Sequence, residues 1–460
     1  MPYRQSHTGS HHYAELSLAV LCLLAGQPSR PLLAQGATQP LWTRDSLRSS
    51  ILGEQRFLRI SLPAFYNAPW NSPERFPVLI VLDAEGDLPF TALAATVRTL
   101  AEGTSTPAMP PLIVVGVETP NPARFRDMTP PPVGAFVPSA GFPAPGGAPA
   151  FLRFLSEELR PYITARYRTQ PTTILAGHSL SGSFAAWAFG HAPEFLVGVI
   201  ATSPTPGWLT VDSLAGRQVV DGIATRTTPG RLFIANGTAE QYLGGGVQSF
   251  ATLVRARSVS GLEFQYEQIP DAAHELARSL GMTPGLRFLF RPVSLSGFQL
   301  EFEDGEDALS KFSAIYDSTR TAYLLGARQL GLLQRLPLNF LSLRARQLGW
   351  PALAPLQLRL CQEITTWYPT LWNGFDCAGD ALARIGRAGE ATASYRRGSE
   401  AARIAGDSAT AERLRRKAEP RPDAPHAPRD DHALLRATNG SILGNRFISK
   451  RHAIIGTRAR

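Results

Sequence analysis

The stretch that decides the fold is 174-ILAGHSLSG-182. It begins as an apolar, strand-like run and continues, after a sharp turn at Ser179, as a helical pattern. A serine at such a strand–turn–helix junction is typical of a nucleophile elbow, in which only small residues fit two positions before and two positions after the serine. Gly177 and Ser181 meet that requirement, with Ser181 in place of the usual second glycine. The sequence therefore predicts that Ser179 is a nucleophile.

Around this turn, strand-like runs alternate with helical patterns as far as about residue 292. The central runs, such as VLIVL at 78–82, are continuously apolar, as in strands buried on both faces. Strands alternating with helices indicate an α/β fold with a doubly wound, mostly parallel sheet. The expected strands are 56–62, 78–82, 112–117, 173–176, 197–202, 232–235 and 262–269. The expected helices are 90–101, 148–166, 181–190 and 245–258.

A serine on an elbow needs a base and an acid, in the chain order serine, acid, histidine. Six of the nine histidines lie near the two ends of the chain. His178 belongs to the elbow itself and is expected to point away from the serine, and His191 belongs to the helix that follows. His274, just after the last expected strand, is therefore the predicted base, which takes the Ser179 proton and later passes it to the leaving alkoxide.

The acid must lie on a loop after an earlier strand. The strand 232–235 runs into Asn-Gly-Thr-Ala-Glu, so Glu240 is the first choice. Asp271, three residues from His274, and Asp221 stay as alternatives.

An oxyanion hole needs two backbone N–H groups aimed at the developing negative charge. One is expected from Leu180, directly after the nucleophile. The other is expected from the loop after the strand 78–82, with Glu85 as the donor.

These segments resemble the branch of the α/β-hydrolases that includes esterase D, enterochelin and other siderophore esterases, feruloyl and acetyl esterases, and mycolyltransferases. The resemblance covers about residues 45–290. The stretches that carry it are SILGEQR at 50–56, VLD at 81–83, RFRDMTP at 124–130, FLRFL at 151–155, ELRPY at 158–162, the elbow, Ser203-Pro204 with Trp208, and His274.

The resemblance implies a serine ester hydrolase that acts on a small-molecule ester without a cofactor or metal. It supports Ser179, Glu240 and His274 by position and places Arg126, Asp127 and Trp208 near the substrate pocket. The chain departs from the family at Ser181 and at Ala84, where a glycine usually follows the aspartate.

The first 36 residues have the features of an export signal. An apolar run of ten residues at 16–25 follows a polar start and is too short to span a bilayer. Small residues at 34–36 offer a cleavage site. We expect residues 1–36 to be a signal peptide, the hydrolase to occupy 37–292, and the protein to be periplasmic or secreted without a stable membrane anchor.

After residue 292 the pattern changes to helices without strands. The last two expected helices carry small residues at the spacing of one tetratricopeptide unit. The expected helices are 307–325, 355–367, 372–385 and 390–405. Residues 293–410 should therefore form a repeat-like helical region able to bind a protein partner. The region contains no histidine, so it should supply no catalytic group, and a chain ending near Val293 should keep some activity.

The net charge of +9 is concentrated in the tail. Residues 411–460 contain 12 Lys or Arg and 5 Asp or Glu, a difference of +7, and are expected to be disordered. The body therefore carries only about +2, which excludes a basic nucleic-acid-binding face. Three cysteines cannot build a disulfide framework or a zinc site with ligand spacing.

Two alternative functions remain open from the residues alone. One is an acyltransferase, in which the same acyl-enzyme reacts with an alcohol other than water. The other is a binding or scaffold protein that keeps the fold without catalysis, against which the complete set of Ser179, Glu240 and His274 argues.

Overall fold

In the computed structural model of the 460-residue chain, most of the two predicted domains is described. The residues described are 40–68, 71, 74–104, 106–131, 146–192, 194–205, 214–226, 228–241, 244–256, 260–298, 307–348 and 351–419. The predicted signal peptide, Trp208 and residues 420–460 of the predicted tail lie outside them. Within these ranges, no helix is both long and apolar enough to cross a membrane.

The described strands form one eight-stranded sheet in the order β1-β2-β4-β3-β5-β6-β7-β8. Strand β2 is antiparallel to β1 and β4. The remaining strands, β4, β3, β5, β6, β7 and β8 in sheet order, are parallel to one another. Their bounds are β1 Thr43–Arg48, β2 Gln55–Ser61, β3 Phe76–Leu82, β4 Ile113–Val117, β5 Thr169–His178, β6 Gly198–Thr202, β7 Gly230–Gly237 and β8 Leu262–Ile269. The predicted mostly parallel α/β sheet is confirmed.

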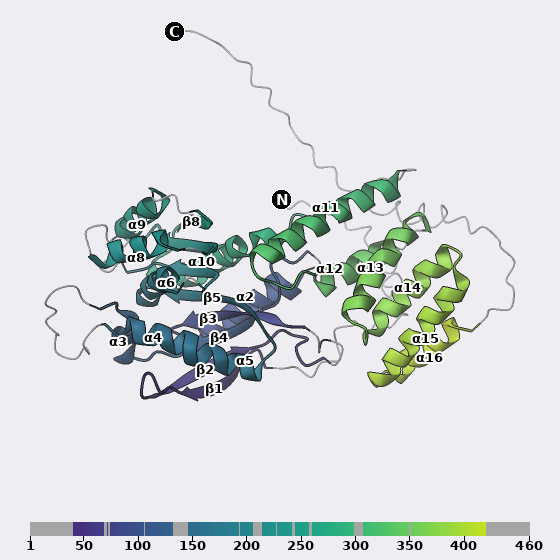
Figure 1. Ribbon diagram of the computed structural model, residues 1–460, viewed down its shortest axis with the longest axis horizontal. Helices are drawn as coiled ribbons and strands as arrows, with labels where there is room; N and C mark the ends of the chain where they lie inside the picture. The colour runs from purple at the N-terminus through teal and green to yellow at the C-terminus, as the bar shows by residue number, and fades with distance from the viewer. Residues whose placement is uncertain are drawn as a thin grey trace, which may run out of the picture.

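Helices cover both faces of this sheet (Figure 1). Because side chains alternate along a strand, Leu79 and Val81 of β3 pack on one face and Val78 and Ile80 on the other. The first face is covered by α2 (Asp87–Glu102) and α10 (His274–Leu289). The second face carries α3 Ala123–Met128, α4 Ala148–Arg153, the π-helical turn η2 Phe154–Leu159, α5 Arg160–Arg166, α6 Leu180–His191, α8 Leu214–Ala224 and α9 Gly244–Ala256.

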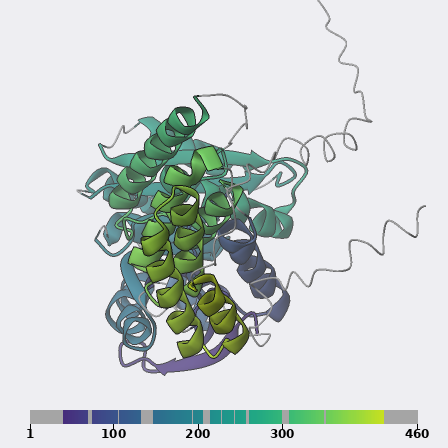
Figure 2. The same cartoon turned by 90° about the vertical axis from the view of Figure 1, so that its right-hand side faces the viewer.

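The C-terminal region is a series of helices beyond one end of the sheet, in which the last five helices pack each on the next (Figures 1 and 2). The bounds are α11 Ala308–Gln329, α12 Leu338–Gln347, α13 Ala354–Trp367, α14 Trp372–Arg384, α15 Ala388–Ile404 and α16 Ser408–Lys417. Helix α16 continues past residue 410, so the predicted start of the tail is too early. The tetratricopeptide assignment stays a prediction.

A disulfide joins Cys361 of α13 to Cys377 of α14. Three cysteines exclude a framework of several disulfides, but nothing in the sequence predicted this single disulfide. The two cysteines are 16 residues apart, and only the packing of the two helices brings them together.

The helical region is attached to the sheet at the amino ends of its parallel strands. Arg335 forms a mostly buried ion pair with Glu74, just before β3, and the Tyr368 hydroxyl donates to the same carboxylate at 2.8 Å. Near the start of β5, the Thr172 hydroxyl donates to the carbonyl of Leu330 at 2.8 Å. Since Ser179 follows the other end of β5, the helical region lies at the opposite end of the strand from the predicted nucleophile.

The hydrophobic core is continuous across this junction. Leu286 and Phe288 of α10 belong to the same buried cluster as Phe312 and Phe340 of the helical region. Helix α11 lies so close to residues 291–293 that a Cβ on Gly326 would be 2.0 Å from the Pro292 carbonyl oxygen. A chain ending near Val293 would therefore expose apolar surface, and its solubility should be lower for that reason.

Candidate active site

The predicted elbow has the required backbone geometry. Ser179 lies between the end of β5 and the start of α6 with φ 58° and ψ −122°. A Cβ on Gly177 would lie 2.2 Å from the Ser181 carbonyl oxygen, so only glycine fits there. The buried Ser181 hydroxyl accepts a hydrogen bond from the His178 N–H and donates one to the His178 carbonyl, both at 2.8 Å. The serine that replaces the usual glycine thus fastens the turn from inside.

Strained backbone collects at this edge of the sheet. The described non-glycine residues with positive φ are Asp83, Ser179, Ser203 and Asp271. They follow the carboxyl ends of β3, β5, β6 and β8, which meet along one edge. Ligands of open α/β sheets bind at that edge, and strained residues concentrate at functional sites. The four positions therefore mark where the site lies.

Glu240 is held rigidly beside His274. One of its carboxylate oxygens, Oε1, accepts hydrogen bonds from the Ser203 hydroxyl at 2.5 Å and from the Gly237 N–H at 2.8 Å. The other, Oε2, lies 3.2 Å from Nδ1 of His274. The Glu240 side chain is only 1% exposed, so its negative charge is kept close to the imidazole. The structure brings these two predicted residues together.

The alternative acids have other surroundings. Asp271 is exposed on the turn after β8, where its backbone N–H donates to the Thr238 hydroxyl at 2.8 Å. Asp221 is exposed on α8. The carboxylate found beside His274 is that of Glu240.

The surroundings of Ser179 include two residues that the sequence analysis did not assign to the site. The Ser179 hydroxyl lies 3.4 Å from the hydroxyl of Thr205. The ring of His178 lies beside that of His274, with centroids 4.5 Å apart. The prediction that the His178 side chain points away from the serine stays a prediction, and its ring packs on that of the predicted base.

His178 is a buried, neutral imidazole. Its Nδ1 lies 3.1 Å from the Thr202 hydroxyl, while its Nε2 is buried without a hydrogen-bond partner among the described residues. Burial, and after it the nearby His274, lowers the pKa of His178 to about 3. His178, His274 and Glu275 form the one group in the described ranges whose side-chain donors could hold a metal ion.

The two predicted oxyanion donors differ in their surroundings. Leu180 is the first residue of α6, where backbone N–H groups have no partner within the helix. Glu85 lies in the loop after β3, and its carboxylate accepts a hydrogen bond from the Thr119 N–H and interacts with the N–H of Glu85 itself. Burial raises the pKa of Glu85. The predicted second donor, the Glu85 N–H, therefore interacts with the carboxylate of Glu85 itself in this structure.

A network around Asp83 fixes that loop, and the sequence analysis did not identify it. Arg124 donates two hydrogen bonds to the Asp83 carboxylate, at 2.8 and 2.7 Å, and the Thr119 hydroxyl donates a third at 2.7 Å. Arg278 of α10 donates to the Asp83 carbonyl, which ties the helix of His274 to the same loop. Arg124 belongs to the same motif, 124–130, from which Arg126 was predicted as a pocket residue. The motif could therefore have indicated Arg124 as well.

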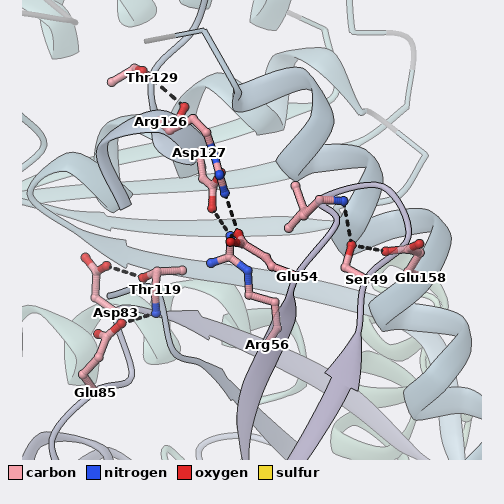
Figure 3. Close-up of polar contacts among 11 residues, drawn as sticks. Ser49, Glu54, Arg56, Asp83, Glu85, Thr119, Arg126, Asp127, Thr129 and Glu158 are labelled. Atoms are coloured by element: carbon pink, nitrogen blue, oxygen red, sulfur yellow. Dashed lines mark hydrogen bonds and ion pairs between the residues drawn. The ribbon is translucent and has the colours of Figure 1, made fainter. Parts of the chain in front are cut away.

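Arg126 and Asp127 belong to a separate ion-pair cluster (Figure 3). The Asp127 side chain is 1% exposed, and its two oxygens accept from Arg56 and from Arg126, the latter at 2.7 Å. Arg126 also donates to Glu54 at 2.5 Å and is about one-third exposed. The Asp127 carboxylate is bound by arginines at both oxygens, and its place near the substrate pocket stays a prediction. It positions Arg126, whose contact with substrate stays a prediction.

A cavity of about 90 Å³ lies beside the elbow, between α2 and α10. Its lining is mostly apolar, with Leu82 and Phe90 among the residues that form it. Four polar side chains also line it, namely Thr96, His178, Arg278 and Ser279. The space is therefore suited to a small apolar group with a polar end.

Comparison with known proteins matches the sheet-forming part of the chain to an esterase family. Residues 49–277 match the family described as "Putative esterase". The chain is 25% identical over 235 residues to the ferri-bacillibactin esterase of Bacillus subtilis, a match that covers 48% of this chain and 81% of that protein. It is 31% identical over 133 residues to the siderophore enterobactin esterase of Emericella nidulans, covering 26% of this chain and 44% of that protein.

A solved structure shares the fold. An IroE-like serine hydrolase from Shewanella oneidensis superposes with a TM-score of 0.54 at 22% sequence identity, over 71% of this chain and 99% of that one.

Proposed function

We propose that Ser179, His274 and Glu240 form the catalytic triad of this chain. Through residues 49–277 the chain belongs to the esterase family of α/β-hydrolases, and it is a serine-type carboxylic ester hydrolase. The observation that carries the proposal is the buried Glu240 carboxylate, fixed by Ser203 and Gly237 and facing Nδ1 of His274. A carboxylate in that place selects the tautomer that leaves Nε2 of the imidazole free to accept a proton.

The reaction follows from these positions. The Ser179 oxygen attacks the ester carbonyl carbon while its proton passes to Nε2 of His274. The Leu180 N–H, together with a second N–H from the loop at Glu85, stabilises the oxyanion. The C–O bond of the ester then breaks, and the leaving alkoxide takes the proton from His274. Water, deprotonated by the same nitrogen, hydrolyses the acyl-enzyme and restores Ser179.

For the substrate, we propose an ester of a siderophore. Two curated relatives are named as esterases of bacillibactin and enterobactin, and the first of them is covered over 81% of its length. Feruloyl esters are the comparison substrates, because the resemblance of the sequence also includes feruloyl esterases.

We also propose that the protein works outside the cytoplasm. The apolar run at 16–25 with small residues at 34–36 supports an export signal. The Cys361–Cys377 disulfide supports the same location independently, because such bonds persist in oxidising compartments and are rare in the cytosol.

A fluorophosphonate probe tests the nucleophile. The full-length protein should be labelled at Ser179, with labelling lost in Ser179→Ala and retained in the matched control Ser183→Ala, whose hydroxyl lies one turn along α6. Labelling elsewhere, or none in the folded protein, would refute the triad.

Substrate class is tested separately with an iron-loaded siderophore trilactone, a feruloyl sugar and a chromogenic acetate. The highest kcat/KM is expected for the trilactone. A higher value for the feruloyl sugar would reject the siderophore proposal and leave the triad intact.

A further inference from the structure

We propose that His178, His274 and Glu275 form an inhibitory binding site for a divalent transition metal such as Zn²⁺. The three side chains offer ligand atoms that all lie within 4.8 Å of one another. Metal at this site would occupy the nitrogen that His274 uses as a base. The inference goes beyond the proposed function and rests on it only for the expected loss of activity.

The available nitrogens point to this use. Nδ1 of His274 faces Glu240, and Nδ1 of His178 faces Thr202, so that Nε2 is the remaining donor on each ring. The His178 side chain is 95% buried, and its Nε2 has no hydrogen-bond partner in the described part of the chain. A buried polar atom without a partner is costly, and coordination would relieve that cost.

The donor set selects the class of metal. Two imidazoles and one carboxylate are the ligands of zinc in many catalytic sites and suit Zn²⁺, Ni²⁺ and Cu²⁺, whereas Mg²⁺ prefers oxygen donors. Tetrahedral bonds of about 2.0–2.1 Å separate ligand atoms by roughly 3.4 Å. Contraction from 4.8 Å therefore requires movement on the order of 1 Å, and the exposed Glu275, in the first turn of α10, is free to supply it.

The local charge tolerates a cation, because Asp83, Glu240 and Glu275 contribute three negative charges near the histidines against two positive charges from Arg124 and Arg278.

Access comes from the solvent side. Glu275 is exposed and His274 is about one-third exposed, whereas His178 forms the buried end of the group. A metal ion can therefore enter past the carboxylate. Because it would bind the base itself, coordination should block both ester hydrolysis and the labelling of Ser179.

The test is a Zn²⁺ titration of the hydrolysis of a chromogenic ester by the full-length enzyme. Inhibition should be reversed by EDTA and absent with Mg²⁺. Glu275→Gln should leave turnover without metal unchanged and raise the inhibition constant at least about tenfold, since loss of a direct ligand costs no less than loss of an outer partner. His191→Asn, which removes a histidine outside the group, should leave the constant unchanged.

Calorimetric titration of Zn²⁺ into Ser179→Ala, with and without His178→Asn, measures binding without catalysis. Asparagine keeps a polar group near the Thr202 hydroxyl and lacks the second nitrogen, so the affinity should fall at least about tenfold. Equal affinity in both proteins, or equal inhibition of the unaltered enzyme and Glu275→Gln, would refute the site. Absence of ester hydrolysis would instead refute the proposed function and leave the calorimetric result valid.

Discussion

The two ends of the parallel strands are built on opposite principles. At the carboxyl ends, Asp83, Ser179, Ser203 and Asp271 hold strained backbone, and His178 keeps a buried nitrogen without a described partner. At the amino ends, the helical region packs on the sheet through a continuous apolar core and the paired groups of Glu74, Arg335 and Tyr368.

The difference separates reactivity from stability along a single strand. β5 takes part in both ends, with Thr172 bonded to the helical region at its start and Ser179 at its finish. Strain at one end persists only when the surrounding structure over-determines it. The helical region therefore stabilises the sheet at the amino ends of its strands, and it leaves the carboxyl edge, which carries the site, uncovered.

The largest effect should come from Ser179→Ala. Removing the attacking oxygen should lower kcat/KM on the order of a thousandfold or more, because the reacting group itself disappears. The free energy of unfolding should change little, since within the described part of the chain the hydroxyl makes a single long hydrogen bond, at 3.4 Å to Thr205. Steady-state kinetics and urea denaturation measure the two quantities. Retention of about a tenth of the activity would refute the assignment.

The next largest effect should come from Glu240→Gln, also at the carboxyl edge. The substitution keeps the size of the side chain and removes the charge that stabilises the His274 imidazolium, so kcat should fall roughly a hundredfold or more. Asp271→Asn is the matched control and should cost far less, because that carboxylate is exposed on the turn. If Asp271→Asn were the damaging change and Glu240→Gln nearly silent, the acid would be Asp271.

At the amino ends, Arg335→Met should reduce stability without reducing catalysis. It leaves the Glu74 carboxylate with the Tyr368 hydroxyl alone, and the loss of a mostly buried charged hydrogen bond costs about 2 kcal/mol. Denaturant unfolding measures this cost, and kcat/KM should stay within about twofold of the unaltered value because the site is at the other end of β5.

The control for that change is Arg387→Met, which breaks the exposed pair with Glu390 and should reduce stability far less than Arg335→Met. A large fall in kcat/KM for folded Arg335→Met would show that the two ends are not independent.

The effect that is smallest at neutral pH should be a change in the pH dependence of stability, which grows as the pH falls. The pKa of His178 is about 3 in the folded protein, below its ordinary value of 6.5, so the unfolded chain takes up this proton first as the pH falls. His178 therefore lowers stability between about pH 6.5 and pH 3, by up to about 1.4 kcal/mol per pH unit. Unfolding of His178→Asn should show a shallower loss from pH 6 to pH 4, and parallel curves would contradict the prediction.

Features with a local signal were predictable from the sequence. The apolar runs at 78–82 and 112–117 identified the central strands, and the turn at Ser179 identified the nucleophile position. Strand β1 was missed because TRDSLR has one apolar residue in six. Helix α10 was missed because its two glycines and Pro284 argue against a helix, and burial against the sheet overrides them.

Features that depend on distant contacts were not predictable. Asp83 and Arg124 are 41 positions apart, and Ser203 and Glu240 are 37 apart, so neither pairing has a sequence signature. The ion pair of Asp127 had no sequence signature for the same reason, because only the fold brings Arg56 of β2 to its buried carboxylate.

The hydroxyl of Ser181 has a consequence for protein engineering. Consensus design would replace this serine by glycine, on the assumption that the elbow asks only for a small residue. Here the hydroxyl closes two bonds on the His178 peptide group, and removal would leave a buried N–H and a buried carbonyl to find other partners. The glycine that is usual at this position is thus not interchangeable with the serine that this chain uses, because the His178 peptide group is bonded to the hydroxyl.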